Sequence, residues 1–292
     1  MYGMKVAIIG KPKAIYTKSL QKAFDLRGHD VPCFPITSLV SSLGQQTKLT
    51  SAGESLADYQ TVILRSIPGG SLEQVIYRMD ALHCLEKTGT RIINPPTAIE
   101  RGVDKYYTLA LMQAEGIPIP RTIVTERFDD AMDAFEQLGG DVVVKPLFGS
   151  EGRGMIRVSD KDIAYRTFRA LEMSHYIFYL QEFIPHGFED IRVFVVGDRA
   201  VAAMTRKGTS WKCNICNGAT GEKLNLNGTL EDLSVKAVKA LGANYGGVDF
   251  LPLEGGKYLL IEVNTIPGWK GLEKTTGFDV AGYLADYILT TD

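Results

Sequence analysis

The stretch Gly246-Gly247-Val248-Asp249-Phe250-Leu251, with Leu259-Leu260-Ile261-Glu262-Val263-Asn264 shortly after it, decides how the rest of the sequence is interpreted. Both pieces are apolar and β-branched, and the polar segment between them contains two glycines, so the sequence predicts two strands joined by a turn. Side chains alternate along a strand, so Glu262 and Asn264 share a face. Pairing of the two strands as a hairpin brings Asp249 to that face as well.

These three side chains form an all-oxygen cluster that suits a magnesium ion. Mg²⁺ keeps several of its waters and usually binds substrate phosphates through one or two carboxylates. Burying two carboxylates on an apolar hairpin without a cation would be costly. The sequence therefore predicts a metal site formed by Asp249, Glu262 and Asn264. A solvent-facing acidic strand edge is the alternative interpretation.

Length, composition and charge exclude several classes of protein. The 292 residues exceed one typical domain and suit two or three lobes, and 45% hydrophobic with 23% charged residues is ordinary for a soluble globular protein. A formal net charge of −2 favours neither a nucleic-acid nor a membrane partner, and no apolar run approaches the roughly 20 residues of a membrane span. The first residues lead into a strand rather than a signal peptide. Four cysteines are too few for a disulfide scaffold, so we expect a cytoplasmic protein.

Cys213 and Cys216 have C-x-x-C spacing, which is typical of zinc and redox sites. Zinc would need two more ligands, and Cys33 and Cys84 are isolated. A redox motif normally follows a strand and opens a helix, whereas residues 217–221 read as a loop. We therefore interpret the spacing as coincidence.

The first 95 residues alternate between strands and helices. The predicted strands lie at 4–9, 31–36, 61–64 and 91–93, and the predicted helices at 17–28 and 72–88, the second capped by Ser71. This order predicts a small parallel α/β lobe that ends at Pro95-Pro96. The segment after the first strand, residues 8–13, lacks the G-x-G-x-x-G fingerprint, which argues against a dehydrogenase.

The remaining residues alternate in a less regular way. Helices are predicted within 97–116, where one begins at Asp104-Lys105, and at 129–138, 160–173, 229–241 and 277–289, the last with Asp279 near its start. Strands are predicted at 121–124, 142–145 and 177–184, and a hairpin over 190–204 turns at Gly197-Asp198.

A glycine-rich loop follows the predicted strand at 142–145. That strand ends on Lys145, and the loop carries Gly149, Gly152 and Gly154. Glycines permit positive φ and close backbone approach, so successive N–H groups can hold phosphate oxygens, with Lys145 as a cationic partner. The spacing is not that of the Walker loop. A plain glycine-rich hairpin turn is the alternative.

Two weaker signals follow the loop. Gln181 and Glu182 end an apolar strand before a proline, and their backbone could face an adenine edge, although a plain core strand would look the same. Arg192 and Arg206 could meet anionic groups, although lone arginines on strands more often pair with carboxylates at the surface.

These pieces, in this order, resemble the ATP-grasp superfamily and, within it, the RimK-like α-L-glutamate ligases. The resemblance covers roughly residues 95–290 and is weaker in the first lobe. The segments that carry it are Val143-Val144-Lys145 with the Gly149–Gly154 loop, Gln181-Glu182-Phe183-Ile184, Asp190-Ile191-Arg192, Val248-Asp249, Glu262-Val263-Asn264, and the motif from Pro267 to Gly277.

The resemblance implies a fold that is α/β and α+β. A Rossmann-like pre-ATP-grasp domain would span residues 1–95, followed by a central or lid subdomain over 96–183 and a C-terminal catalytic subdomain over 184–292. ATP would lie between the two subdomains. The implied cofactors are ATP and Mg²⁺, with two ions that Mn²⁺ can replace. Family members commonly assemble as dimers or tetramers, so we expect a homo-oligomer.

The resemblance also implies roles for individual residues. Lys105 and Lys145 would contact the phosphates, and the loop with Gly149, Ser150, Gly152 and Gly154 would cover them. Gln181, Glu182, Phe183 and Ile184 would line the adenine and the hinge, with Asp190 on the ribose side. The catalytic set, which would face the phosphates or the acyl-phosphate, is Arg192, Arg206, Lys212 and Asn214. The metal ligands would be Asp249, Glu262 and Asn264.

The segment from Trp211 to Gly218 departs from the family pattern. RimK-like relatives often have Arg-Ser-Asn-x-His-Arg-Gly there. Lys212 and Asn214 remain as equivalents, while Cys216 and Asn217 replace a histidine and an arginine. Because this segment lies near the acceptor, the departure leaves the acceptor open and does not affect the ATP half of the site.

The chemistry implied by the resemblance has two steps. A substrate carboxylate attacks the γ-phosphate of ATP to give an acyl-phosphate, and an amine then displaces phosphate to form an amide. Phosphoryl transfer of this kind needs positioning and charge neutralisation more than covalent help. We therefore predict an ATP-dependent carboxylate–amine ligase whose partners are ATP, L-glutamate and a carboxylate-bearing acceptor.

The acceptor differs among family members, which modify a ribosomal protein tail, a deazaflavin coenzyme, tetrahydromethanopterin or free amino acids. Residues 69–74 and 103–108 look more like the branch that modifies the pterin, so we predict a glutamyl-type carboxylate on a tetrahydromethanopterin-like coenzyme. A ribosomal protein tail, or another peptide or amino-acid carboxylate, is the alternative. A non-catalytic ATP-binding regulatory protein and a phosphotransferase are the alternatives from other classes.

Overall fold

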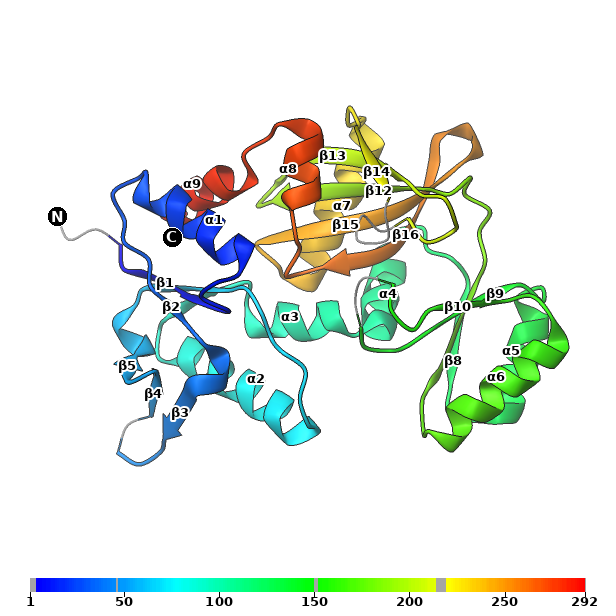
Figure 1. Ribbon diagram of the computed structural model, residues 1–292, viewed down its shortest axis with the longest axis horizontal. Helices are drawn as coiled ribbons and strands as arrows, with labels where there is room; N and C mark the ends of the chain where they lie inside the picture. The colour runs from blue at the N-terminus through cyan, green and yellow to red at the C-terminus, as the bar shows by residue number, and fades with distance from the viewer. Residues whose placement is uncertain (1–3, 46, 150–151, 214–218, 292) are drawn as a thin grey trace.

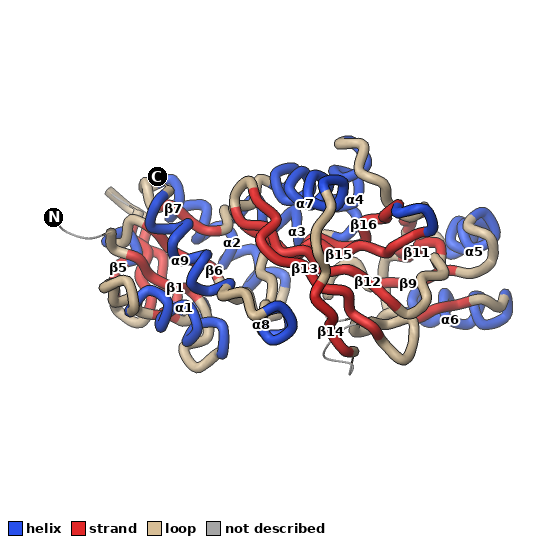
Figure 2. Tube along the Cα trace, turned by 90° about the horizontal axis from the view of Figure 1, so that it is seen from above, coloured by secondary structure: helices blue, strands red, loops and turns tan. Residues whose placement is uncertain are grey.

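The computed structural model describes residues 4–45, 47–149, 152–213 and 219–291, which form an elongated molecule with three main sheets (Figure 1). An N-terminal lobe lies at one end, and a small lobe around β8–β11 lies at the other. A five-stranded antiparallel sheet connects them, and the view from above shows the same order (Figure 2).

The N-terminal lobe is a parallel α/β unit, as predicted. Its sheet has the strand order β2-β1-β6-β7. The strands are β1 (Val6–Ile9), β2 (Cys33–Phe34), β6 (Thr61–Leu64) and β7 (Arg91–Ile93), and the helices are α1 (Ile15–Asp25) and α2 (Leu72–Lys87). β2 is shorter than the predicted strand at 31–36, because prolines at 32 and 35 flank it and lack the N–H that a ladder needs.

The sequence did not predict a small antiparallel sheet that extends from this lobe. It consists of β3 (Leu39–Ser42), β4 (Lys48–Ser51) and β5 (Glu54–Ser55), and two 3₁₀ turns, η1 (Ile36–Ser38) and η2 (Leu56–Asp58), flank it. These strands have only two to four residues, which is too short for an alternating pattern to be recognised.

Ser71 caps α2, as predicted, and forms a complete capping box with Gln74. The Gln74 N–H donates to the Ser71 hydroxyl at 3.3 Å, and the Ser71 N–H donates to the Gln74 side-chain oxygen at 3.2 Å. We expect Ser71→Ala to lower the free energy of unfolding by about 1 kcal/mol, because one helix N–H loses its partner. Urea unfolding measures this loss. The exposed Ser42→Ala is the control, and an equal effect of both substitutions would contradict the capping role.

Two helices lead from the N-terminal lobe to the small lobe at the other end. They are α3 (Pro96–Val103) and α4 (Lys105–Ala114), and the Asp104 side chain caps α4 by accepting from the Tyr107 N–H at 2.9 Å, so this helix begins where predicted. The small lobe has the antiparallel strand order β10-β9-β11-β8. Its elements are β8 (Thr122–Thr125), α5 (Phe128–Gln137), β9 (Val142–Lys145), β10 (Ile156–Val158), α6 (Lys161–Met173) and β11 (Phe178–Glu182). Helices α5 and α6 share a core with this sheet.

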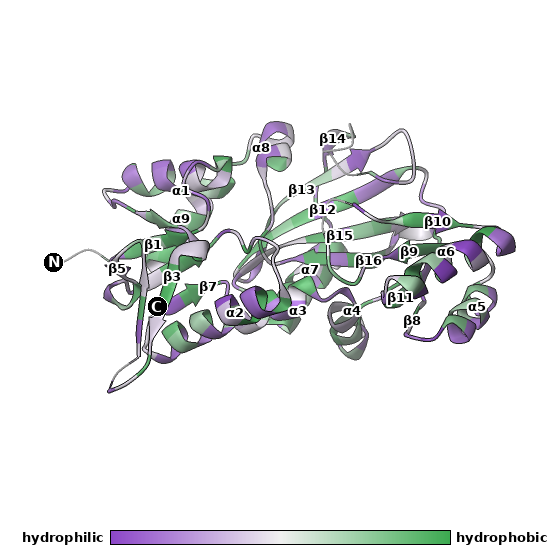
Figure 3. Cartoon of the chain, turned by 60° about the horizontal axis from the view of Figure 1, so that its bottom comes forward, coloured by the Kyte–Doolittle hydropathy of each residue, from purple (hydrophilic) through white to green (hydrophobic). Residues whose placement is uncertain are grey.

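The central sheet contains both predicted hairpins and has the antiparallel order β14-β13-β12-β15-β16. Its strands are β12 (Glu189–Val196), β13 (Arg199–Lys207), β14 (Thr220–Lys223), β15 (Tyr245–Leu253) and β16 (Lys257–Asn264), with the 3₁₀ turn η4 (Glu254–Gly256) between the last two. Helix α7 (Gly228–Leu241) and α4 share a core with one face of the sheet. Apolar residues dominate along β12 and β15 (Figure 3).

The chain ends with α8 (Lys270–Thr276) and α9 (Val280–Thr290), and α9 packs against α1 of the N-terminal lobe. Their shared core joins Phe24 to Leu284, and Arg27 pairs with Asp286 at 2.5 Å. Each main sheet lies within one of the three predicted domains, whereas α9, assigned to the third domain, completes the core of the first. The domain boundaries therefore stay a prediction.

Asn94 links the N-terminal lobe to the central hairpin through hydrogen bonds. Its buried side-chain amide donates to the carbonyls of Tyr245, at 2.8 Å, and Thr265, at 2.6 Å. Its oxygen accepts from the N–H groups of Asn244 and Tyr245. These bonds hold the start of β15 and the residue after β16, the two strands that carry the predicted metal ligands. Within the described residues, no helix has the length and apolar character needed to cross a membrane.

Candidate functional site

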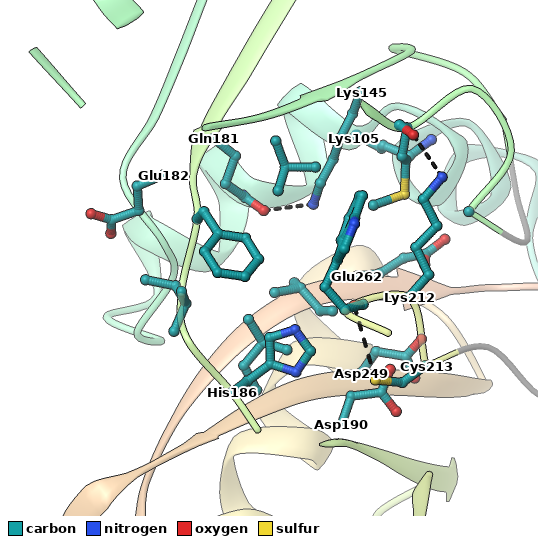
Figure 4. A pocket seen from close by; sticks show the side chains of 18 of the residues that line it. Lys105, Lys145, Gln181, Glu182, His186, Asp190, Lys212, Cys213, Asp249 and Glu262 are labelled. Carbon is teal, nitrogen blue, oxygen red and sulfur yellow. Dashed lines mark hydrogen bonds between the residues drawn. The ribbon is translucent and has the colours of Figure 1, made fainter. Parts of the chain in front are cut away.

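A pocket that is partly open to solvent lies between the small lobe and the central sheet (Figure 4). Twelve of the predicted site residues line it: Lys105, Lys145, Gly152, Gln181, Glu182, Phe183, Ile184, Asp190, Arg206, Lys212, Asp249 and Glu262. Gly149, Gly154, Arg192 and Asn264 are not among the lining residues. Ser150 and Asn214, like Cys216, lie outside the described residues.

The register of the central hairpin places the predicted metal ligands on one face. Asp249 is directly opposite Glu262, and Gly247 is opposite Asn264. A side chain at Gly247 would be crowded, since a Cβ there would lie 3.0 Å from a guanidinium nitrogen of Arg192 and 3.1 Å from the Cβ of Pro267. The glycine therefore leaves room for Arg192 to cross the sheet.

A bulge in this hairpin adds a lining residue that sequence reasoning missed. The register shifts between Asp249 and Phe250, so Phe250 faces Leu260 and Ile261 is left without an opposite residue. As a result, Ile261 and Glu262 both line the pocket, although neighbours on a regular strand point to opposite faces.

Other lining residues were missed because their signals are common ones. They are Val143, Met155, His186, Trp211, Cys213 and Leu251. The alternation that places Asp249 on the pocket face also indicates Leu251, and the alternation that places Lys145 there indicates Val143. The others lie in or beside loops, where the sequence gives no such signal.

A buried ion-pair network occupies the centre of the pocket face. Arg206 binds Asp190 through two hydrogen bonds of 2.5 and 2.8 Å, and its Nη2 lies 3.0 Å from an oxygen of Asp249. Arg192 also binds Asp249 through both its oxygens. The four side chains are 2–12% exposed, so these arginines do pair with carboxylates, but in the interior and not at the surface.

The pKa values of the three carboxyl groups in and beside this network are shifted in different directions. Burial raises the pKa of Asp190 to about 6, although Arg206 opposes the shift. Burial acts on Asp249 in the same sense, but Arg192 and Arg206 outweigh it and hold the pKa of Asp249 below its ordinary value. For Glu262, burial and the facing Asp249 raise the pKa.

Lys145 and Gln181 meet at the opposite wall of the pocket. The ammonium of Lys145 donates to the side-chain oxygen of Gln181 at 2.5 Å (Figure 4). Burial lowers the pKa of Lys145 to about 8. The next residue, Glu182, points away from the pocket and pairs with Arg121 at 2.6 Å, so only its backbone is available for the predicted adenine edge.

The glycine-rich loop is bound at both of its ends by lysines. Lys105 donates to the carbonyl of Gly149 at 2.7 Å, and Lys212 donates to the carbonyl of Met155 at 2.7 Å. Burial lowers the pKa of Lys105. Phosphate contact by these two lysines, as the resemblance implies, would require them to exchange a carbonyl for a phosphate oxygen.

Aromatic rings form the wall beside the hinge. The guanidinium of Arg157 lies 3.5 Å from the centre of the Phe183 ring, and Trp211 meets that ring edge-on at 6.4 Å. The Nδ1 of His186 bonds to the carbonyl of Glu189 at 2.8 Å. Such a wall suits a flat aromatic ligand.

The donor set of the hairpin fits a hard divalent cation. Asp249 and Glu262 face each other, and their mutual repulsion favours a cation between them, for which Asp249 would exchange one of its arginine contacts. In the described part of the chain, no hydrogen bond or ion pair engages the Glu262 carboxylate. Those residues contain no group of three His, Cys, Asp or Glu side chains that could hold a metal, whereas the predicted trio includes an amide.

Cys213 does not support a redox or metal role. Its side chain is 3% exposed, and burial raises the pKa of the thiol to about 11, so it stays protonated at neutral pH. Coincidence remains the preferred interpretation of the C-x-x-C spacing.

Known proteins match both halves of the chain. Residues 4–99 match the RimK PreATP-grasp domain, and residues 102–288 match the RimK-like ATP-grasp domain. A tetrahydromethanopterin:alpha-L-glutamate ligase of Methanococcus maripaludis is 32% identical over 291 residues, which is 98% of each chain. A probable alpha-L-glutamate ligase of Aliivibrio fischeri is 33% identical over 294 residues, covering 99% of this chain and 96% of that protein.

Solved structures share the fold at lower sequence identity. The ATP-grasp ligase PsnB, complexed with a minimal precursor, has a TM-score of 0.79 at 22% identity and covers 99% of each chain. A RimK domain protein from Sphaerobacter thermophilus has a TM-score of 0.76 at 22% identity, covering 97% of this chain and 98% of that one. The predicted fold class, a pre-ATP-grasp domain followed by an ATP-grasp fold, is confirmed. The chain belongs to the family of RimK-like ATP-grasp ligases.

Proposed function

We propose that the protein is an ATP-dependent ligase that adds L-glutamate to a glutamyl-type carboxylate on a tetrahydromethanopterin-like coenzyme. The observation that carries the ligase is the pocket in which Lys105 and Lys145 face the Asp249–Glu262 pair across one cavity. For the acceptor, the support is similarity to methanogen proteins named tetrahydromethanopterin:alpha-L-glutamate ligase. The protein of Methanocaldococcus jannaschii is 32% identical over 98% of this chain.

In this proposal one wall of the pocket binds the nucleotide and the other binds the metal ions. Lys105 and Lys145 bind the phosphates of ATP, and the aromatic wall at Phe183 holds its base. Asp249, Glu262 and Asn264 would hold two Mg²⁺ ions, which Mn²⁺ can replace. Bound Mg²⁺ supplies charge neutralisation at the phosphates.

The arginines of the ion-pair network act on both steps of the reaction. The acceptor carboxylate attacks the γ-phosphorus, ADP leaves, and the glutamate amine then attacks the acyl carbon and releases phosphate. Arg206 lines the pocket and Arg192 binds Asp249 beside it, so both place fixed positive charge near the reacting groups, and such cations stabilise negative charge that develops in either step. The glycine-rich loop keeps water away from the acyl-phosphate.

A peptide or protein carboxylate is the second candidate acceptor. Bacterial relatives named only probable alpha-L-glutamate ligase are as similar as the methanogen proteins, for example 31% identical over 98% of this chain in Trichodesmium erythraeum. Similarity alone therefore does not choose between a coenzyme and a peptide.

Phosphate release from ATP and Mg²⁺ with L-glutamate, across a panel of carboxylates, tests the proposal. The panel holds a pterin with a glutamyl tail, a deazaflavin coenzyme, a Glu-ended peptide and amino acids. We expect release with the pterin and a mass gain of one glutamyl residue on it. Release with the peptide alone would overturn the pterin assignment, and nucleotide binding without release on any acceptor would overturn the ligase.

Two lysine variants, one in the pocket and one at the surface, serve as the test and the control in this assay. Lys145→Met removes the buried pocket cation, whereas Lys239→Met removes a surface lysine that pairs with Asp198 at 2.6 Å. Only the first is expected to abolish phosphate release.

A further inference from the structure

A short chain of polar groups crosses the sheet of the small lobe and ends at Lys145. The ammonium of Lys145 donates to the Gln181 oxygen at 2.5 Å, and the Gln181 amide nitrogen donates to the Thr122 hydroxyl oxygen at 2.9 Å. The Thr122 hydroxyl itself donates to the carbonyl of Pro120 at 3.0 Å. Of these hydrogen-bonded groups, only Lys145 binds phosphate in the proposed function.

The direction of these bonds fixes which end of the Gln181 amide faces the lysine. A hydroxyl has one proton, and that of Thr122 is directed at the Pro120 carbonyl, so the Thr122 oxygen can only accept from Gln181. The amide nitrogen of Gln181 must therefore face Thr122, and its oxygen must face Lys145. Without the threonine hydroxyl, the N–H end of the amide loses its acceptor, and the Gln181 oxygen is held less firmly against the ammonium.

The strand register shows that this arrangement is built into the sheet. Gln181 on β11 lies directly opposite Thr122 on β8 and opposite Val143 on β9, which is two residues before Lys145. Gln181 is 3% exposed and Lys145 is 8% exposed, so bulk water does not offer either group a substitute partner.

We propose that Thr122 is a positioning residue which, through the Gln181 amide, holds the Lys145 ammonium in place and in its charged form for binding of nucleotide phosphates. This inference rests on the proposed function. Burial and two charged groups act on Lys145 besides this hydrogen-bonded relay from Thr122 through Gln181. Burial lowers the pKa of Lys145 to about 8, Glu262 on β16 raises it, and Lys105 on α4 lowers it. A hydrogen bond from the ammonium to an amide oxygen favours the charged form.

Three variants test the relay because they should shift the pH dependence of nucleotide binding in stated directions, and a fourth is the control. Binding requires the ammonium, so affinity falls as the pH rises through the pKa of Lys145. Gln181→Leu removes the acceptor, which lowers the pKa by about one unit and moves this fall to lower pH. Gln181→Glu adds a negative charge and moves the fall to higher pH. Thr122→Val should act as Gln181→Leu does, and Thr122→Ser, which keeps the hydroxyl, should act as the wild type does.

Calorimetric titration with a non-hydrolysable ATP analogue gives the affinities. Relative to wild type, we expect Thr122→Val to weaken binding less than about twofold near pH 6 and about tenfold near pH 9. A purely structural role predicts equal weakening at every pH, and no opposite shift for Gln181→Glu.

Competitive labelling of amines measures the pKa of Lys145 in the protein without nucleotide. The extent of labelling is determined by mass spectrometry of the peptide that contains Lys145. The labelling midpoint should fall in Thr122→Val and in Gln181→Leu, and rise in Gln181→Glu. If Thr122→Val has the labelling midpoint of the wild type and unfolds at the same temperature, the relay is wrong. The proposed ligase function is not affected by that result. Failure of the wild-type protein to bind the ATP analogue at any pH overturns the proposed function instead.

Discussion

Glu262→Gln is expected to lower the rate of ligation by about 10²–10³-fold while making the free protein slightly more stable. The activity falls because a cation at this hairpin loses one of its two carboxylate ligands, while the substitution keeps the shape of the side chain. The stability rises because Glu262 is partly buried, faces Asp249, and has no ion-pair partner among the described residues.

The pKa of Glu262 gives the sign of the stability effect. Burial and Asp249 raise its folded-state pKa above that of the unfolded chain, so the folded protein binds this proton more tightly. The stability that comes from the protonated form is present at low pH and is lost as the pH rises through the folded pKa. At neutral pH the ionised carboxylate therefore costs stability, and glutamine removes that cost.

Ligation rates at several Mg²⁺ concentrations, together with thermal unfolding at neutral pH, check both parts. Glu254→Gln is the matched control, because Glu254 lies in the exposed turn of the same hairpin. It should change neither quantity. A Glu262→Gln protein that ligates at the wild-type rate would remove Glu262 from the metal site, and one that unfolds at lower temperature would show that the carboxylate stabilises the free fold.

The position of Asp249 opposite Glu262 could be predicted from the sequence because it depends on local properties. Two apolar strands with a glycine-containing turn form a hairpin, and the two-residue period of a strand then decides which side chains share a face. The same period fails at Ile261, since the bulge that brings it to the pocket depends on the pairing of the whole hairpin. Sequence patterns predict regular strands, and bulges interrupt them without a strong sequence signal.

The partners of the arginines could not be predicted, because they depend on the order of strands in the sheet. Arg192 lies on β12, and Asp249 follows it 57 residues later on β15. They meet because β12 and β15 are neighbours in the sheet, with Arg192 directly opposite Asp249. A carboxylate site and two arginines were predicted as separate features, and only the strand register shows that they form one network.

Arg206→Met is expected to lower the free energy of unfolding at neutral pH by about 3–5 kcal/mol. Arg206 is 5% exposed and bridges Asp190 and Asp249, so its loss leaves Asp190 as a buried carboxylate without its cation, while Asp249 keeps Arg192. Methionine fills most of the same volume, so the loss measures the charge and not a cavity.

The loss should shrink as the pH falls, and the reason lies in Asp190. Burial already raises the pKa of Asp190 to about 6 in the presence of Arg206, and removal of the arginine raises it further. Above these pKa values the variant must bury a bare carboxylate. As the pH falls through about 6, Asp190 becomes neutral in both proteins, and the difference between them decreases.

Urea unfolding at pH 7.5 and near pH 5 measures both effects, with Arg199→Met as the control. Arg199 lies on the same strand, β13, but is exposed, so we expect a change of less than about 0.5 kcal/mol at either pH. Asp190→Asn combined with Arg206→Met should restore much of the stability at neutral pH, because it removes the carboxylate that the single variant leaves unpaired. If Arg206→Met alone were as stable as the wild type at pH 7.5, the pairing of Arg206 would be dispensable for folding, and Arg206 would be retained in the pocket for its action on substrate alone.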